Sequence, residues 1–376
     1  MQSSKNIAEV VSHFKCDADV SSYKPYGSGH INDTFFLKNV SADGSDYLLQ
    51  RINHSIFTNV EKLTENMRKV TEHLKSKIKE YGNGNPLKEV MTLIPTDNGQ
   101  FFYKDSAGDY WRMFYFLSDT KSYDVVETEK QAYEGGKAFG KFQAMLSDIP
   151  AGEMFEVIPD FHNIQKRLQH LDEAVANDAC GRVASVAAEL EIVAKYASSM
   201  QYFQQPAQVA ALPKRVIHND TKFNNVLLNS NDEAQCVIDL ETVMDGYVAY
   251  DFGDAIRTIV NTTTEDEADL SKIQLNLSLF NAYVQGYLKE ASRFLTDAEV
   301  NSLMKGALLL PYMQAVRFLT DHINGDKYFK IKFEGHNLQR AKAQFQLVKI
   351  LDANAAAMQE TILKEMNSYN TAHTNG

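Results

Sequence analysis

The sequence is poor in cysteine and has no long apolar run. Its three cysteines, Cys16, Cys180 and Cys236, are odd in number and far apart, so neither a disulfide framework nor a zinc site is expected. No stretch approaches the roughly 18 consecutive apolar residues that a membrane-spanning helix requires. The first residues also lack a basic segment followed by an apolar one, which would mark a secretory signal. We therefore expect reduced cysteines, no membrane span and a cytoplasmic location.

An excess of positive charge is also missing. The chain has 38 Lys and Arg against 49 Asp and Glu, a net charge of -11, without any block of five or more like charges. This balance argues against binding to nucleic acid or to an anionic membrane surface. Two phosphate-binding signatures are absent as well. No G-x-x-x-x-G-K-[ST] occurs, and the third glycine of G-x-G-x-x-G would fall at Asn32.

What is present is the composition of an ordinary globular protein, 376 residues long and 44% hydrophobic. A single core seldom grows beyond about 250 to 300 residues, so we expect two lobes. Short strand patterns with tight turns dominate residues 1–117, and helical patterns dominate residues 118–376. The sequence therefore predicts an α+β protein. It has a small N-terminal lobe built on an antiparallel sheet and a larger, mainly helical C-terminal lobe, as a monomer or dimer.

Residues 215–247 carry the most informative pattern of polar groups. Short apolar strands are predicted at 216–217, 226–228 and 236–238. The first runs into His218 and Asp220, Asn225 precedes the second, and Asp239 follows the third. Side chains at strand ends are held rigidly while still facing a ligand. We therefore place the chemistry of the chain in this stretch.

The spacing matches the needs of phosphoryl transfer from ATP. Such a site requires a carboxylate that accepts the proton of the attacking hydroxyl, together with oxygen ligands for Mg²⁺. Asp220 is the predicted base, and Asn225 and Asp239 are the predicted metal ligands. Lys222 is predicted to neutralise charge on the transferred phosphate, or else to be a solvated loop lysine. The alternative for the whole stretch is a capped loop with solvated acids.

The N-terminal lobe contains candidate nucleotide-binding groups. Gly27, Gly29 and His30 lie in a Gly-rich turn between two predicted strands, where backbone N–H groups could meet phosphates, or which could be a plain hairpin. The strand at 47–52 carries Arg51, a candidate phosphate-binding cation, with an edge charge as the alternative. A helix predicted at 60–79 carries Glu65, the expected partner of that cation.

These motifs resemble the aminoglycoside phosphotransferase and choline kinase superfamily, and most of all its N-acetylhexosamine 1-kinases. Besides the catalytic stretch, the likeness rests on residues 26–34 (YGSGHINDT), 49–53 (LQRIN), 250–258 (YDFGDAIRT) and 317–328. The resemblance implies a two-lobed, protein-kinase-like fold that uses ATP and Mg²⁺. One departure is clear, because Gln50 stands about where kinases carry a phosphate-binding lysine.

The resemblance also implies a substrate. It places Arg317 and Tyr328 among the sugar-contacting residues and points to the anomeric C1 hydroxyl of N-acetylglucosamine or N-acetylgalactosamine. It makes Asp251 and Asp254 braces of the catalytic loop. The alternative for Arg317 is an exposed ion pair with Asp321, four residues away on one helix.

Other functions remain open at this stage. The chain could instead be an aminoglycoside, choline or homoserine kinase, although cationic substrates need several acids and the late helices carry few. It could also be a non-catalytic, kinase-like scaffold.

Overall fold

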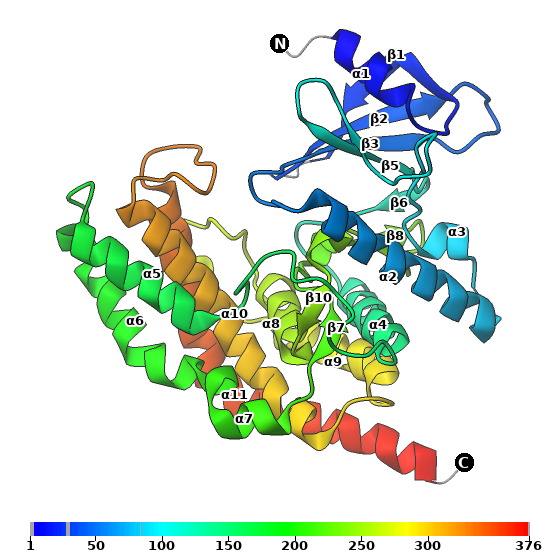
Figure 1. Ribbon diagram of the computed structural model, residues 1–376. Helices are drawn as coiled ribbons and strands as arrows, with labels where there is room; N and C mark the ends of the chain where they lie inside the picture. The colour runs from blue at the N-terminus through cyan, green and yellow to red at the C-terminus, as the bar shows by residue number, and fades with distance from the viewer. Residues whose placement is uncertain (1–3, 28–30, 83, 375–376) are drawn as a thin grey trace.

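The computed structural model describes residues 4–27, 31–82 and 84–374 (Figure 1). Its N-terminal part is built on an antiparallel sheet with the strand order β1-β2-β3-β5-β4. The strands are β1 (Ala18–Pro25), β2 (Asp33–Asn39), β3 (Tyr47–Ile52), β4 (Tyr103–Lys104) and β5 (Tyr110–Tyr115). Three helices accompany this sheet, namely α1 (Ser4–Val11), α2 (Val60–Tyr81) and α3 (Pro86–Glu89).

The two faces of this sheet pack against different helices. Leu49 and Met113 face the buried apolar residues of α1, such as Val10. Phe114 instead packs in the apolar cluster that contains the buried residues of α2, such as Met67. Successive side chains of a strand point to opposite faces. Neighbouring side chains of β3 therefore point to opposite faces of the sheet, so they contact different groups.

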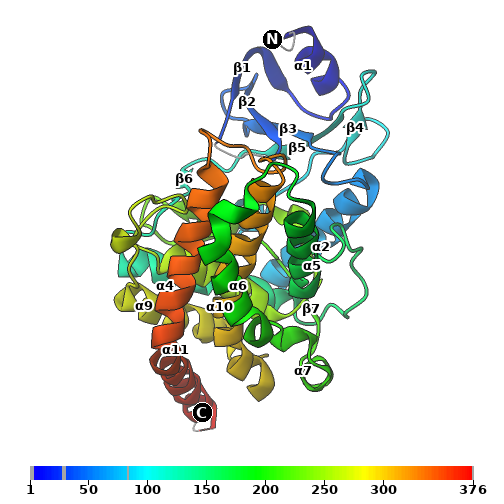
Figure 2. The same cartoon turned by 90° about the vertical axis from the view of Figure 1, so that its left-hand side faces the viewer.

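The C-terminal part is mainly helical. Its helices are α4 (Glu129–Leu146), α5 (Ile164–Asn177), α6 (Ala187–Met200), α7 (Pro206–Ala211), α8 (Val248–Ile259), α9 (Leu277–Ala291), α10 (Asp297–Ile323) and α11 (His336–Thr374). Figure 2 shows α6, α10 and α11 running side by side. Two small sheets lie among them, made of β6 (Thr120–Lys121), β7 (Arg215–Ile217), β8 (Val226–Asn229), β9 (Ala234–Val237) and β10 (Met244–Gly246). In the described part of the chain, no helix is both long and apolar enough to cross a bilayer.

The predicted α+β fold is confirmed, with an antiparallel sheet at one end and helices at the other (Figure 1). The boundary predicted at residue 117 falls between the end of β5 and the start of β6. One apolar cluster extends across this boundary, since Leu63 of α2 packs together with Val216 and Leu240. The sheet is thus held against the strands that carry the catalytic stretch.

Helix α4 runs close to α9 because glycine lies at their contact. A Cβ atom built on Gly136 would lie 2.1 Å from the carbonyl oxygen of Tyr283, and one on Gly140 would lie 2.5 Å from that of Tyr287. Both distances are far below van der Waals contact, and both atoms belong to backbone. The absence of a side chain at these two positions therefore permits the close packing of the helices. Helix α4 also contacts β7, so its close packing against α9 supports the strand that leads into the catalytic stretch.

We expect Gly136→Ala to lower the free energy of unfolding by at least about 2 kcal/mol, because overpacking against rigid backbone forces the helices apart. Chemical denaturation of the variant and the wild type measures this. Lys130→Ala, at an exposed position of the same helix, is the matched control and should change stability by less than about 0.5 kcal/mol. Equal midpoints for Gly136→Ala and the wild type would contradict the packing argument.

Candidate active site

The loop between β7 and β8 brings together three residues predicted to act in catalysis. Lys222 Nζ lies 3.2 Å from Asp220 Oδ2. Asn225 donates from Nδ2 to the backbone oxygen of Asp220 at 2.8 Å and to its Oδ2 at 3.3 Å. The Asp220 side chain keeps 24% of its surface exposed. A substrate can therefore reach this carboxylate, while Asn225 and Lys222 fix its position.

Buried partners hold the backbone of this loop. The Asp251 carboxylate accepts the backbone N–H groups of His218, at 2.9 Å, and Asn219, at 2.7 Å. Asn219 adopts a left-handed conformation with φ 65°, which is uncommon outside glycine but which asparagine tolerates better than most residues. Thr242 donates its hydroxyl to the His218 carbonyl oxygen. Asp251 thus braces the catalytic loop, in agreement with the role implied by its motif.

Asp239 follows β9 and lies beside other acids. His218 donates from Nε2 to the carbonyl oxygen of Ile238 at 2.8 Å, which ties the catalytic loop to the residue before Asp239. Burial raises the pKa of Asp239 to about 7, and the charges of Glu241 and Asp220 add to the rise. Additional positive charge would stabilise the ionised form of the Asp239 carboxylate. A divalent cation would supply that charge.

The donor set fits a hard cation. Asn225 directs its Nδ2 toward Asp220, so its Oδ1 is left as a ligand, and Asp239 adds a carboxylate. Among the described residues there is no group of three or more His, Cys, Asp or Glu arranged to hold a metal. A cation at this place would therefore take few protein ligands and complete its shell with water and phosphate oxygens, as Mg²⁺ commonly does.

Asp220 has the opposite electrostatic environment from Asp239. Burial alone would raise its pKa, but the charges of Lys222 and His218 outweigh this effect and lower it. In return, the Asp220 charge raises the pKa of Lys222. Asp220 is therefore ionised at neutral pH, so that it can accept a proton, and Lys222 is charged.

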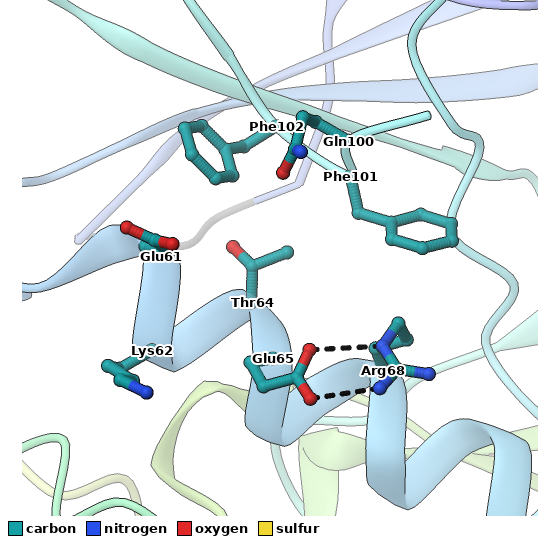
Figure 3. Close-up of a pocket in the computed structure, with 8 residues that line it drawn as sticks. All are labelled: Glu61, Lys62, Thr64, Glu65, Arg68, Gln100, Phe101 and Phe102. Atoms are coloured by element: carbon teal, nitrogen blue, oxygen red, sulfur yellow. Dashed lines mark hydrogen bonds and ion pairs between the residues drawn. The ribbon is translucent and has the colours of Figure 1, made fainter. Parts of the chain in front are cut away.

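The structure corrects two predictions for the N-terminal lobe. Arg51 lies on the face of β3 that packs toward α1, where its guanidinium pairs with Asp33 and with Asp109 Oδ2, the latter at 3.1 Å. Glu65 pairs with Arg68 at 2.9 Å, in a surface pocket of about 240 Å³ between α2 and residues 100–102 (Figure 3). The expected Arg51 to Glu65 pair is therefore wrong. Strand alternation directs Arg51 away from the face that carries Gln50.

A buried arginine missed by sequence reasoning occupies the opposite face. Arg112, on β5, is paired in register with Gln50 and is only 1% exposed. It donates from Nε to Gln50 Oε1 at 3.0 Å and from Nη2 to Glu241 Oε2 at 2.5 Å. Asn32 donates to the same Glu241 oxygen at 2.7 Å. Arg112 therefore links the sheet to the segment that carries Asp239, two residues before Glu241.

Arg112 also has a donor without a partner. Its Nη1 is buried and forms no hydrogen bond within the described part of the chain. The sequence contains one signal for this residue, a single charge within the apolar and aromatic run of β5. A charge at such a place is buried and needs a partner.

The Gly-rich turn is described only in part. Gly27 has φ 78°, a conformation that favours glycine. Gly29 and His30 lie outside the described residues, so their predicted contact with nucleotide stays a prediction.

The structure brings Arg317 and Tyr328 together. The Arg317 guanidinium lies over the rings of Phe329, at 5.3 Å, and of Tyr328 and Phe161, both at 5.9 Å. Tyr328 is 59% exposed. Asp321 is buried and accepts the backbone N–H groups of residues 327–329. The alternative of an exposed Arg317 to Asp321 ion pair is therefore wrong, and Asp321 instead shapes the turn that presents Tyr328.

This aromatic cluster is connected to the catalytic loop. His162, next to Phe161, donates from Nε2 to the carbonyl oxygen of Asn219 at 3.2 Å. Burial lowers the pKa of His162 to about 3, with smaller contributions from the charges of Arg317 and Arg167. The ring is therefore neutral at physiological pH and acts as a fixed spacer between Asn219 and Phe161. No sequence motif marked His162, because its partner lies 57 residues away.

The fold is similar to that of many solved structures, among them the following three. An aminoglycoside phosphotransferase from Alicyclobacillus acidocaldarius is 12% identical, with 94% of this chain and 96% of that chain covered and a TM-score of 0.62. A microcompartment-associated aminopropanol kinase is 15% identical, with 94% and 98% covered and a TM-score of 0.64. A choline kinase from Cryptosporidium parvum is 12% identical, with 98% and 99% covered and a TM-score of 0.60. At these identities the likeness shows the protein-kinase-like fold.

The sequence itself supplies the family. Residues 22–290 match the phosphotransferase enzyme family, a span that contains Asp220, Asn225 and Asp239. The matched region covers most of the chain and includes both the sheet and the catalytic stretch. The protein therefore belongs to the phosphotransferase enzyme family.

Proposed function

We propose that this protein is an ATP-dependent sugar kinase that phosphorylates the anomeric C1 hydroxyl of an N-acetylhexosamine. The observation that carries a kinase reaction is the contact of an ionised Asp220 with Asn225, near Asp239, whose pKa is raised by burial and by neighbouring acids. The aromatic and arginine cluster around Tyr328 supports a sugar acceptor, because sugar sites combine aromatic faces with a few polar groups. The choice of the C1 hydroxyl rests on the motif resemblance.

In the proposed reaction, Asp220 accepts the proton of the acceptor hydroxyl and orients it toward the γ-phosphate. Lys222 lies beside Asp220 and contributes positive charge where negative charge develops. Asn225 and Asp239 would hold Mg²⁺, which neutralises the phosphate oxygens when bound. The brace from Asp251 keeps the loop in place. Catalysis then depends on positioning, which is how phosphoryl transfer is accelerated.

In the proposed reaction, Arg112 supplies the positive charge of the N-terminal lobe. Gln50 occupies the β3 position where a lysine was expected, and it contacts Arg112 directly. Arg112 then pairs with Glu241, close to the proposed metal ligand Asp239. We propose that this pair holds the metal-binding segment against the sheet.

A kinase acting on a cationic alcohol is the second candidate, since choline and aminopropanol kinases share the fold. Such acceptors carry an ammonium group, which needs acids or aromatic faces nearby. Around Tyr328 the structure combines aromatic faces with two arginines, whose positive charge disfavours an ammonium group. This arrangement favours the neutral sugar.

An acceptor panel tests the proposed function. With ATP and Mg²⁺, we expect ADP release with N-acetylglucosamine or N-acetylgalactosamine, and phosphorus NMR should show a sugar 1-phosphate. The 1-O-methyl glycoside of the same sugar should give no product, because its C1 oxygen is blocked. Turnover of the methyl glycoside would move the reaction to another hydroxyl. ADP release with choline alone would overturn the sugar assignment.

A further inference from the structure

Two arginines near the proposed acceptor site lack acidic partners. Arg167, on α5, donates from Nη2 to the backbone oxygens of Phe161, at 2.8 Å, and Asp160, at 3.3 Å. Arg317, on α10, donates from Nη1 to Gln314 Oε1 at 3.0 Å. Within the described residues, neither guanidinium has a carboxylate at ion-pair distance. Arg167 Nε is buried and forms no hydrogen bond within that part of the chain.

The two guanidinium groups lie in one cluster. Arg317 stacks over Phe161, whose carbonyl oxygen holds Arg167. Burial and, to a smaller extent, the charge of Arg317 together lower the pKa of Arg167 to about 10. Like charges that are partly buried together disfavour each other. A ligand oxygen beside them would offset this unfavourable interaction.

The cluster is joined to the catalytic loop through His162. His162 lies between Phe161 and the catalytic loop and contacts Asn219, the neighbour of Asp220. Tyr328, half of whose surface or more is open to solvent, covers Arg317 from the other side. An acceptor bound between Tyr328 and Asp220 would therefore have both arginines within its surroundings.

We propose that Arg167 and Arg317 form a specificity subsite that binds a carbonyl or carboxylate oxygen of the acceptor and repels ammonium groups. The proposal rests on the sugar kinase function and narrows it. Guanidinium groups present planar forks that match amide and carboxylate oxygens. An acetamido sugar satisfies them, whereas the free amino sugar brings a third positive charge.

Matched acceptors test the subsite. N-acetylglucosamine and glucosamine differ only at C2, which carries an acetamido or an ammonium group, and glucuronic acid carries a hydroxyl at C2 and a carboxylate at C6. For the wild type, kcat/KM should be at least about 100-fold higher for N-acetylglucosamine than for glucosamine, which corresponds to about 2.7 kcal/mol. Activity with glucuronic acid in place of N-acetylglucosamine would identify the bound oxygen as a carboxylate.

Variants of Arg167 separate charge from hydrogen bonding. Arg167→Gln should raise KM for N-acetylglucosamine about 10- to 100-fold, the range of one lost charge-assisted hydrogen bond, with kcat changed less. Its preference over glucosamine should shrink. Arg167→Lys should also weaken N-acetylglucosamine binding but should still reject glucosamine, because the charge remains. Lys166→Gln, at the adjacent exposed position, should leave both acceptors within about twofold of wild type.

The outcomes show separately whether the proposed subsite and the proposed kinase function are correct. Ligand-observed NMR measures binding of the three sugars without turnover, and a thermal midpoint confirms that each variant is folded. Absence of ADP release from every acceptor would overturn the proposed function. If folded Arg167→Gln and Arg167→Lys both bind and discriminate like the wild type, the subsite is wrong even though the kinase function stands. Equal wild-type binding of glucosamine and N-acetylglucosamine would also overturn it.

Discussion

Asp220→Asn should abolish phosphorylation while leaving nucleotide affinity within about threefold of wild type. The loss of kcat should be at least about 100-fold, the lower end of the contribution of a general base. Asparagine keeps the shape of the side chain and its contact with Asn225 but cannot accept the hydroxyl proton. Because Lys222 and His218 outweigh burial and hold the pKa of Asp220 below its usual value, the base is ionised in neutral buffer. Steady-state kinetics and nucleotide titration measure both quantities.

The control for this experiment is Asp172→Asn, which removes the same charge from an exposed position on α5. It should retain wild-type kcat within about twofold, because exposed charges at a distance are largely screened. Near-wild-type turnover in Asp220→Asn would show that another group accepts the proton. Loss of nucleotide binding together with activity would indicate that the loop itself has been distorted.

Arg112→Met should reduce both stability and activity. Removing one member of a buried ion pair leaves Glu241 charged and unpaired, at a cost of about 3–5 kcal/mol in the free energy of unfolding. The double variant Arg112→Met/Glu241→Gln should recover most of that loss, because no buried charge remains. Denaturant unfolding measures the stability of each variant, and steady-state kinetics measures its activity.

Measuring both stability and activity shows whether Arg112 has a structural role or a role in the reaction. If the Arg112 charge serves the reaction, the double variant should stay at least about 10-fold below wild type in kcat/KM although its stability has recovered. Arg51→Met is the matched control, because its partly exposed pairs contribute about 0–1 kcal/mol and its side chain lies on the other face of the sheet. Wild-type activity in the double variant would limit Arg112 to a structural role. A large loss of activity in Arg51→Met would return the cationic role to Arg51.

Arg51 and Arg112 show that a local sequence pattern does not determine which face of a sheet a side chain occupies. Both Arg51 and Arg112 were visible as charges within strands, and only strand pairing decides which face each presents. A shift of one residue reverses that assignment. The register places Arg51 opposite Trp111, and it places Gln50 opposite Arg112. The wrong Glu65 pairing has the same origin, since a neighbour one helical turn away, Arg68, satisfies that carboxylate first.

The stretch that contains Asp220, Asn225 and Asp239 could be predicted because these residues lie close together in the sequence. A short loop and a hairpin hold these residues, so their sequence spacing restricts their spatial spacing, and the polar residues at strand ends mark the site. The strands at residues 215–217, 226–229 and 234–237 agree with this prediction. The sequence by itself therefore determined the fold class and the family, and it predicted where the catalytic loop lies.

The tertiary structure alone decided which distant groups join that loop. Arg112 reaches Glu241 across 129 residues, His162 reaches Asn219 across 57, and Arg167 meets Arg317 between two helices. No periodicity records such meetings, because they depend on how sheet and helices pack. Burial then determines which polar groups need partners, and within the described residues Arg112 Nη1 and Arg167 Nε are buried donors left without one.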